Sequence, residues 1–169
     1  MDDRKLSPTW FGCVAVVGLI SLLLIAMFAF VLYGIGSGRL ASIEALPQGK
    51  IPATQLSQIS QIVSLRPNER VLYFYSAAMT PSGDGNLFTN ERVISYTTDY
   101  GPLEVVDADY DEIQGATLNR SDSWLDDSTL DVLLKDGTTI TLWVSSEKDR
   151  DVDFHAKLVE QLERAREPR

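Results

Sequence analysis

Hydrophobic residues fill one continuous stretch near the start of the chain. It begins at Phe11 and ends at Tyr33 and contains no charged side chain, with a leucine run at its centre: Leu22, Leu23 and Leu24. A bilayer core requires about 20 apolar residues in a helix, whose backbone satisfies its own hydrogen bonds. The pattern therefore predicts a membrane-spanning helix over residues 11–36, after a short N-terminal tail, residues 1–10.

A cleaved secretory signal is the alternative explanation of this stretch. Signal sequences have apolar cores of about 7 to 15 residues, so the stretch is long for one, although small residues follow it. Arg4 and Lys5 flank one end and Arg39 and Lys50 the other, which slightly favours a cytoplasmic N-terminus and an extracytoplasmic domain. We expect a single-pass membrane protein.

Glycine, serine and proline dominate residues 37–52, which predicts a linker. Gly34 and Gly38, at its start, have the spacing of a helix-dimer motif, but a flexible helix exit is the favoured interpretation. A short helix should follow from Thr54, because apolar residues then recur at helical spacing: Leu56, Ile59, Ile62 and Val63. A second amphipathic helix is predicted over residues 151–166, with one apolar face: Phe154, Leu158, Leu162 and Ala165.

Between these two helices, hydrophobic and polar residues alternate, as they do in half-buried strands. Asp136-Gly137 between two alternating runs predicts a tight hairpin. We also expect a turn over residues 80–86 and a helical turn or corner over residues 107–112. The predicted strands are residues 70–77, 87–89, 92–97, 103–106, 116–120, 130–135 and 139–144. The sequence thus predicts a mainly β domain with α, residues 53–166, in which seven meandering strands are closed by a C-terminal helix.

Net charge restricts the partners of this domain. The chain carries 24 acidic and 15 basic residues, a formal net charge of -9. Phosphate backbones and anionic headgroups repel such a surface, so we expect no nucleic acid partner and no electrostatic docking on the bilayer.

Residues with catalytic or metal-binding chemistry are scarce. His155 is the only histidine and Cys13, inside the apolar stretch, the only cysteine, which leaves no material for a nucleophilic triad or a zinc site. One acidic cluster is a candidate calcium site: Asp107, Asp109, Asp111 and Glu112. An EF-hand loop counted from Asp107 lacks the glycine required at its sixth position and the glutamate required at its twelfth. A solvated acidic corner is therefore favoured. We therefore expect no enzyme, no metal and no cofactor.

Two tryptophans and two aspartates are candidates for an interaction surface. Trp124 lies in a polar loop and Trp143 on the outer phase of its strand, where exposed aromatic side chains often anchor interfaces. Cover by the leading helix or the linker is the slightly favoured interpretation for Trp143. Asp126 and Asp127 belong to an acidic loop that suits a basic partner, or that is simply solvated.

Three segments of the domain resemble the bacterial pleckstrin-homology-like (PH-like) domains. Glu69-Arg-Val-Leu-Tyr-Phe-Tyr75 is similar to their first strand, Leu87-Phe-Thr-Asn-Glu-Arg-Val-Ile-Ser-Tyr96 to a recurring strand pair, and Tyr110-Asp-Glu-Ile113 to a corner. The resemblance implies a seven-stranded, strongly bent sheet capped by a helix, in a bacterial cell membrane or inner membrane protein. Within the second segment we expect Arg92 to point outward.

One departure from the family concerns lipid recognition. Members that bind phosphoinositides carry basic residues in the first turn, whereas residues 80–86 contain Asp84 and no basic residue. Phosphoinositide binding is therefore not expected. The expected function is that of a membrane-anchored, non-catalytic protein-interaction or scaffolding module in an unknown pathway, and the alternative is lipid or membrane-surface sensing.

Overall fold

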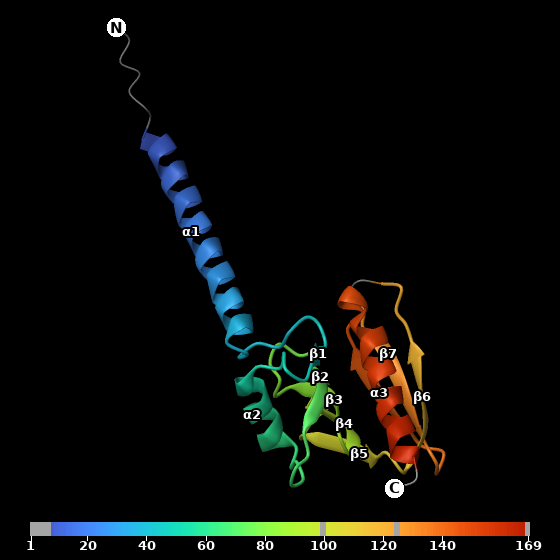
Figure 1. Ribbon diagram of the computed structural model, residues 1–169. Coiled ribbons are helices and arrows are strands. Elements are labelled where there is room, and N and C mark those ends of the chain that lie inside the picture. The colour runs from blue at the N-terminus through green and yellow to red at the C-terminus, as the bar shows by residue number, and fades with distance from the viewer. Residues whose placement is uncertain (1–7, 99–100, 124–125, 168–169) are drawn as a thin grey trace.

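A computed structural model describes residues 8–98, 101–123 and 126–167, with side chains from Val14 onward. Its first helix, α1 (Pro8–Gly36), projects away from the rest of the chain (Figure 1). The part Val14–Gly36 has a mean hydropathy of 2.9 and none of its most apolar window is buried, so this helix is long and apolar enough to cross a membrane. Leu22, Leu23, Leu24 and Tyr33 are all exposed on it. Phe11 lies in the same helix, outside the described side chains.

Eight antiparallel strands form two sheets in meander order. The five-stranded sheet contains β1 (Leu46–Pro47), β2 (Val71–Tyr75), β3 (Asp84–Thr89), β4 (Arg92–Thr97) and β5 (Glu104–Asp109). The three-stranded sheet contains β6 (Ile113–Asn119), β7 (Ser128–Leu134) and β8 (Thr139–Val144). With the C-terminal helix beside them, the two sheets have the PH-like fold that the sequence predicts. The eighth strand is β1, two residues long, inside the segment predicted as a linker.

Two helices cover opposite sides of this arrangement (Figure 1). α2 (Ala53–Ile62) lies against the outer face of the five-stranded sheet, and α3 (Arg150–Arg166), after the single 3₁₀ turn η1 (Glu147–Asp149), packs beside β6. Phe154, Leu158 and Leu162 of α3 are buried, as their spacing predicts, whereas Ala165 is exposed.

Strands β2, β3 and β4 are buried on both faces, whereas most of β5 is exposed, and two separate cores result. Inside the sheets, Tyr73, Phe88 and Phe154 form an aromatic cluster in which the Phe88 and Phe154 rings meet edge to face at 4.9 Å. Beneath α2 lies the second core, formed by residues of α2, its flanks and the outer face: Ile51, Ile59, Val63, Val71, Phe74, Leu87, Ile94 and Tyr96. Burial on both faces explains why β2 reads as a nearly continuous apolar run.

Two local predictions are wrong at strand ends. The predicted turn over residues 80–86 ends early, because β3 already begins at Asp84, whose carboxylate accepts hydrogen bonds from Ser76 Oγ and the Ala77 and Ala78 amides. The predicted helical corner begins late, because β5 extends to Asp109 and pairs along its whole length with β4. At both places polar residues belong to the strand ends: Asp84 to β3, and Asp107 and Asp109 to β5.

The prediction for Arg92 is also wrong, because this side chain is buried. Its guanidinium donates to both carboxylate oxygens of Glu69, at 2.9 and 3.1 Å, to Asp107 and to the Ser64 carbonyl. Thr89 Oγ1 donates to the same Glu69 carboxylate at 2.9 Å. Arg92 and Glu69, each in a segment that resembles the PH-like domains, therefore form a buried structural ion pair and are not part of an exposed surface.

Candidate functional site

The segment between α1 and α2 has fixed contacts with the domain. Ala45 is fully buried in the inner core, and Glu44 forms ion pairs with Lys148 (3.4 Å) and Arg150 (3.2 Å). At the start of α2, Thr54 Oγ1 donates to the Ser37 carbonyl (2.7 Å) and Gln55 Nε2 to the Leu40 carbonyl (3.1 Å). The segment that follows α1 is thus bound both to the start of α2 and to the residues at the start of α3.

Two glycines make this close packing possible. Gly34 is buried against Leu40, and a Cβ on Gly34 would come within 2.5 Å of Leu40 Cδ1. Gly38 has a φ of +70° and would place a Cβ 2.6 Å from Pro52 Cβ. The four-residue spacing that suggested either a helix-dimer motif or a flexible exit therefore serves the packing of the chain onto its own domain.

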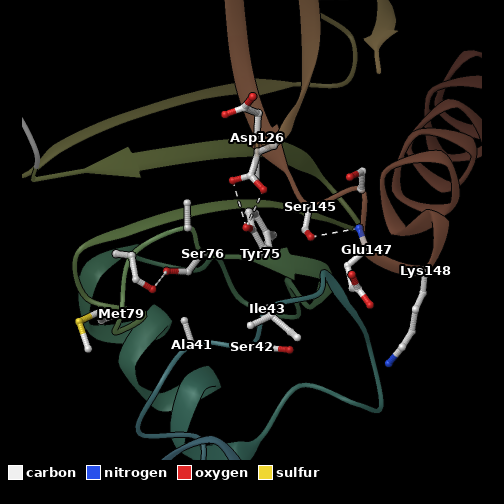
Figure 2. A pocket seen from close by; sticks show the side chains of 14 residues that line it. Ala41, Ser42, Ile43, Tyr75, Ser76, Met79, Asp126, Ser145, Glu147 and Lys148 are labelled. Carbon is white, nitrogen blue, oxygen red and sulfur yellow. Dashed lines mark hydrogen bonds between the residues drawn. The ribbon is translucent and has the colours of Figure 1, made fainter. Parts of the chain in front are cut away.

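A groove of about 680 Å³ opens where this segment meets the domain (Figure 2). We call it the linker groove. One rim is the segment Ala41 to Ile43, and Asp126 and Tyr75 lie across from it (Figure 2). The groove is lined by residues from four places in the sequence: Ala41, Ser42, Ile43, Tyr75, Ser76, Ala77, Ala78, Met79, Asp126, Asp127, Ser145, Ser146, Glu147 and Lys148.

Two large apolar side chains stand at this groove and face solvent. Met79 is 82% exposed and Ile43 is 70% exposed. The backbone joins their segments directly, because the Ala41 amide donates to the Met79 carbonyl at 3.0 Å. Large apolar side chains that are exposed beside a hollow are typical of a surface that another molecule covers.

Asp127 occupies the inner wall of the groove. Its carboxylate accepts the hydroxyl hydrogen of Tyr75, with oxygen–oxygen distances of 2.9 and 3.0 Å. Burial, together with the nearby charges of Asp84 and Asp126, raises the pKa of Asp127 despite this hydrogen bond. Carboxylates whose pKa is shifted by burial and by neighbouring charges are more frequent at functional sites than elsewhere.

A second cavity, of about 350 Å³, adjoins the linker groove. We call it the seam cavity, because it lies between β3 and β4 of one sheet and β8 of the other. Trp143, which is 51% exposed, stands on its β8 side. Asp127 and Ala77 line both cavities, so the two hollows share a wall.

The structure thus brings together three of the four predicted surface residues. Asp126 and Asp127 line the linker groove, and Trp143 lies in the adjoining seam cavity, uncovered by helix or linker. Trp124 falls outside the described residues. The sequence did not point to Tyr75, Ile43 or Met79, since their alternation and spacing show nothing about which distant segments they meet.

The other candidate residues, from the acidic cluster and α3, make structural contacts within the domain. Asp107 pairs with Arg92, and Asp109 pairs with Arg66 at 2.8 Å. His155 Nε2 lies 3.2 Å from the Ala116 carbonyl, at the flank of the buried face of α3. Among the described residues, no three histidine, cysteine, aspartate or glutamate side chains are placed to hold a metal ion.

Comparison with known proteins adds one structural likeness. No family model and no curated protein matches the chain. A solved structure of a DUF1696 family protein with a pleckstrin-homology domain, from Shewanella loihica, is similar to it at 16% sequence identity and a TM-score of 0.46. That match covers 72% of this chain and 96% of the other. Such a likeness carries no argument about ligands or activity, which must come from the groove itself.

Proposed function

We propose that this chain is a single-pass, membrane-anchored, non-catalytic module that binds a partner protein in the linker groove. The observation that carries the proposal is the groove's position. Its rim, Ala41 to Ile43, begins five residues after Gly36, the end of α1, and is fixed to the domain. A partner in the same membrane would meet this face first.

The chemistry of the groove supports protein binding over catalysis. The exposed Met79 and Ile43 offer apolar contact area, and Asp126 and Glu147 offer charge at the rim. The perturbed carboxylate, Asp127, has Tyr75 as its hydrogen-bond donor, with no nucleophile and base paired beside it among the described lining residues.

Crosslinking in intact membranes tests this function. A photoreactive p-benzoylphenylalanine at position 79 should yield a reproducible, discrete protein adduct, whereas the same residue at Val152, exposed on α3, should not. A reporter fused after Arg169 shows on which side of the membrane the adduct forms. Equal labelling from both positions, or adducts to lipid alone, would contradict the proposal.

Lipid contact is the second candidate function, favoured by the exposure of Met79 and Ile43 beside the helix exit. The fragment to test begins at residue 37, because β1 and the buried Ala45 belong to the folded domain. Flotation of residues 37–169 with phosphatidylcholine or phosphatidylglycerol vesicles decides it. Binding that disappears in Met79→Glu and Ile43→Glu variants would support lipid contact.

A further inference from the structure

The two adjoining cavities have the shape of a path rather than of a single pocket. The linker groove reaches from Ile43 and Lys148 to Asp127, and the seam cavity continues from Asp127 to Trp143. Both are open hollows lined by side chains of several strands and loops. An elongated ligand can contact both, whereas a compact metabolite would occupy only one.

Negative charge predominates along this path. The linker groove is lined by Asp126, Asp127 and Glu147, and the seam cavity by Asp127 and Asp84. Lys148 is the one basic side chain among the described lining residues, and its ammonium group already pairs with Glu44. Phosphate, carboxylate and nucleotide ligands are repelled from such a surface, and a cation is attracted.

The carboxylates differ in what they can still accept. Asp84 is held by three donors from residues 76–78, so its charge acts on a ligand only through space. Asp127 accepts from Tyr75, and Asp126, on the rim, is exposed. An ionised carboxylate has about four acceptor positions, so Asp127 and Asp126 retain capacity for a guanidinium or an ammonium group.

Trp143 supplies a contact of another kind at the far end of the path. Half of this large side chain is exposed, beside Thr141 on the same face of β8. An indole ring binds aliphatic side chains by apolar contact and guanidinium groups through its π face. Cationic and apolar recognition therefore follow one another along the path.

Together these features assign a chemistry to the partner, and the assignment rests on the proposed function. We infer that the partner inserts an extended, positively charged segment, which places a Lys or Arg side chain against Asp126 and Asp127 and a neighbouring side chain on Trp143. The apolar rim, Ile43 and Met79, then covers the flank of that segment.

The test uses the full chain in nanodiscs of zwitterionic phosphatidylcholine, which avoids adsorption of peptides to anionic lipid. The probes are two fluorescent nonapeptide pools with the same degenerate apolar and small positions. The central residue is arginine in one pool and citrulline, its neutral isostere, in the other. We expect the arginine pool to bind about tenfold more tightly or better, since hydrogen bonds between a guanidinium group and a carboxylate are stronger than those of a neutral donor.

Matched variants locate the binding. The double variant Asp126→Asn, Asp127→Asn should abolish the difference between the pools, and Trp143→Ala should weaken both. The control, Glu163→Gln with Glu167→Gln, changes the net charge equally at exposed positions that line neither cavity and should leave binding unchanged. A cooperative urea transition shows that each variant is folded.

Several outcomes would overturn the inference: equal affinity for the two pools, no binding of either, or arginine preference retained in the double variant. Crosslinking at position 79 separates this failure from that of the proposed function. If position 79 crosslinks to a protein in membranes but the arginine pool is not preferred, the groove binds a partner whose segment is not cationic. If position 79 crosslinks to lipid alone, the proposed protein partner is also ruled out.

Discussion

The Tyr75 hydroxyl donates to the Asp127 carboxylate across the boundary between the two sheets, at an oxygen–oxygen distance of 2.9 Å, and Asp127 lies in the wall that the linker groove and the seam cavity share. Tyr75 ends β2 of the larger sheet, and Asp127 directly precedes β7 of the smaller one. Burial, followed by the charge of Asp127, raises the pKa of the Tyr75 hydroxyl. The hydrogen therefore stays on Tyr75, which donates it to the Asp127 carboxylate.

Asp127→Asn should not destabilise the fold at neutral pH. The folded-state pKa of Asp127 lies above its usual 3.8, so the native state binds this proton more tightly than the unfolded chain does. That stabilising contribution is present at acid pH and is lost as pH rises through the folded-state pKa. Asparagine keeps an acceptor for Tyr75 and removes the buried charge, so stability should stay within about 1 kcal/mol of wild type or exceed it.

Urea unfolding of residues 37–169 at pH 7 and pH 4 measures this. The gain in the variant should be larger at pH 7 than at pH 4, because the charges of Asp84 and Asp126 oppose ionisation of wild-type Asp127, in a groove that Glu147 and Lys148 also line. Tyr75→Phe serves as the opposite control, because it removes the donor and should lower stability at pH 7. A clear loss of stability in Asp127→Asn would contradict this account.

Arg92→Ala should destabilise the domain strongly. It leaves the Glu69 carboxylate, whose side chain is fully buried, without its bidentate partner, and breaking such a pair costs about 3–5 kcal/mol. Replacing both members with apolar residues, Glu69→Leu and Arg92→Met, should recover much of that loss. Urea midpoints of the single and double variants compare the two, and a double variant no better than Arg92→Ala would contradict the prediction.

The same pair predicts a loss of stability in acid. Burial raises the pKa of Glu69, but hydrogen bonds from Arg92, Thr89 and the Arg66 amide outweigh it and hold the pKa below 4.5. A depressed pKa contributes stability that is present above the unfolded value and lost as pH falls through the folded value. Wild-type stability should therefore decline below about pH 4.5, and Glu69→Gln should flatten that part of the profile.

Gly38→Ala should loosen the segment between α1 and the domain. A β-carbon at a φ of +70°, 2.6 Å from Pro52 Cβ, is strained and costs about 1 kcal/mol or more. Amide hydrogen exchange in residues 37–52 should accelerate while β7 and β8 remain protected. Gly36→Ala is the matched control, since its added Cβ meets nothing within 4 Å. Unchanged exchange in Gly38→Ala would show that the segment tolerates the strain.

Trp143→Ala should change binding far more than stability. The side chain is half exposed, so we expect a loss of less than about 1 kcal/mol in the free energy of unfolding. Its neighbour Leu142 is fully buried, and Leu142→Ala should cost about 2–5 kcal/mol. Thermal unfolding of the two variants makes the comparison, and similar losses would mean that Trp143 serves the core.

Much of the architecture follows from local patterns. The apolar stretch from Phe11 to Tyr33 requires a helix, because only a helix satisfies its backbone without water. Asp136-Gly137 requires a tight hairpin, and Gly137 has the positive φ, +90°, that such a turn needs. The spacing of Phe154, Leu158 and Leu162 fixes the buried face of α3. Each of these signals depends on residues close together in the sequence.

The site depends on residues that are far apart in sequence. Asp126 and Asp127 were visible as acidic residues and Trp143 as an exposed aromatic candidate, but nothing in their order showed that they border adjoining cavities. Arg92 is buried although it lies on the outer face of β4, opposite Val93, because alternation shows which residues share a face but not that a partner such as Glu69 covers that face.

By itself, the sequence determined the apolar helix, the meander of strands and the closing helix, since these depend on period, turn residues and length. Tertiary structure alone decided that residues 37–52 pack on the domain, that Glu44 pairs with Lys148 and Arg150, and that Asp127 accepts from Tyr75 where the two cavities adjoin. The physical reason is that burial and hydrogen bonding between distant segments depend on how the two sheets are placed, and no local pattern contains that placement.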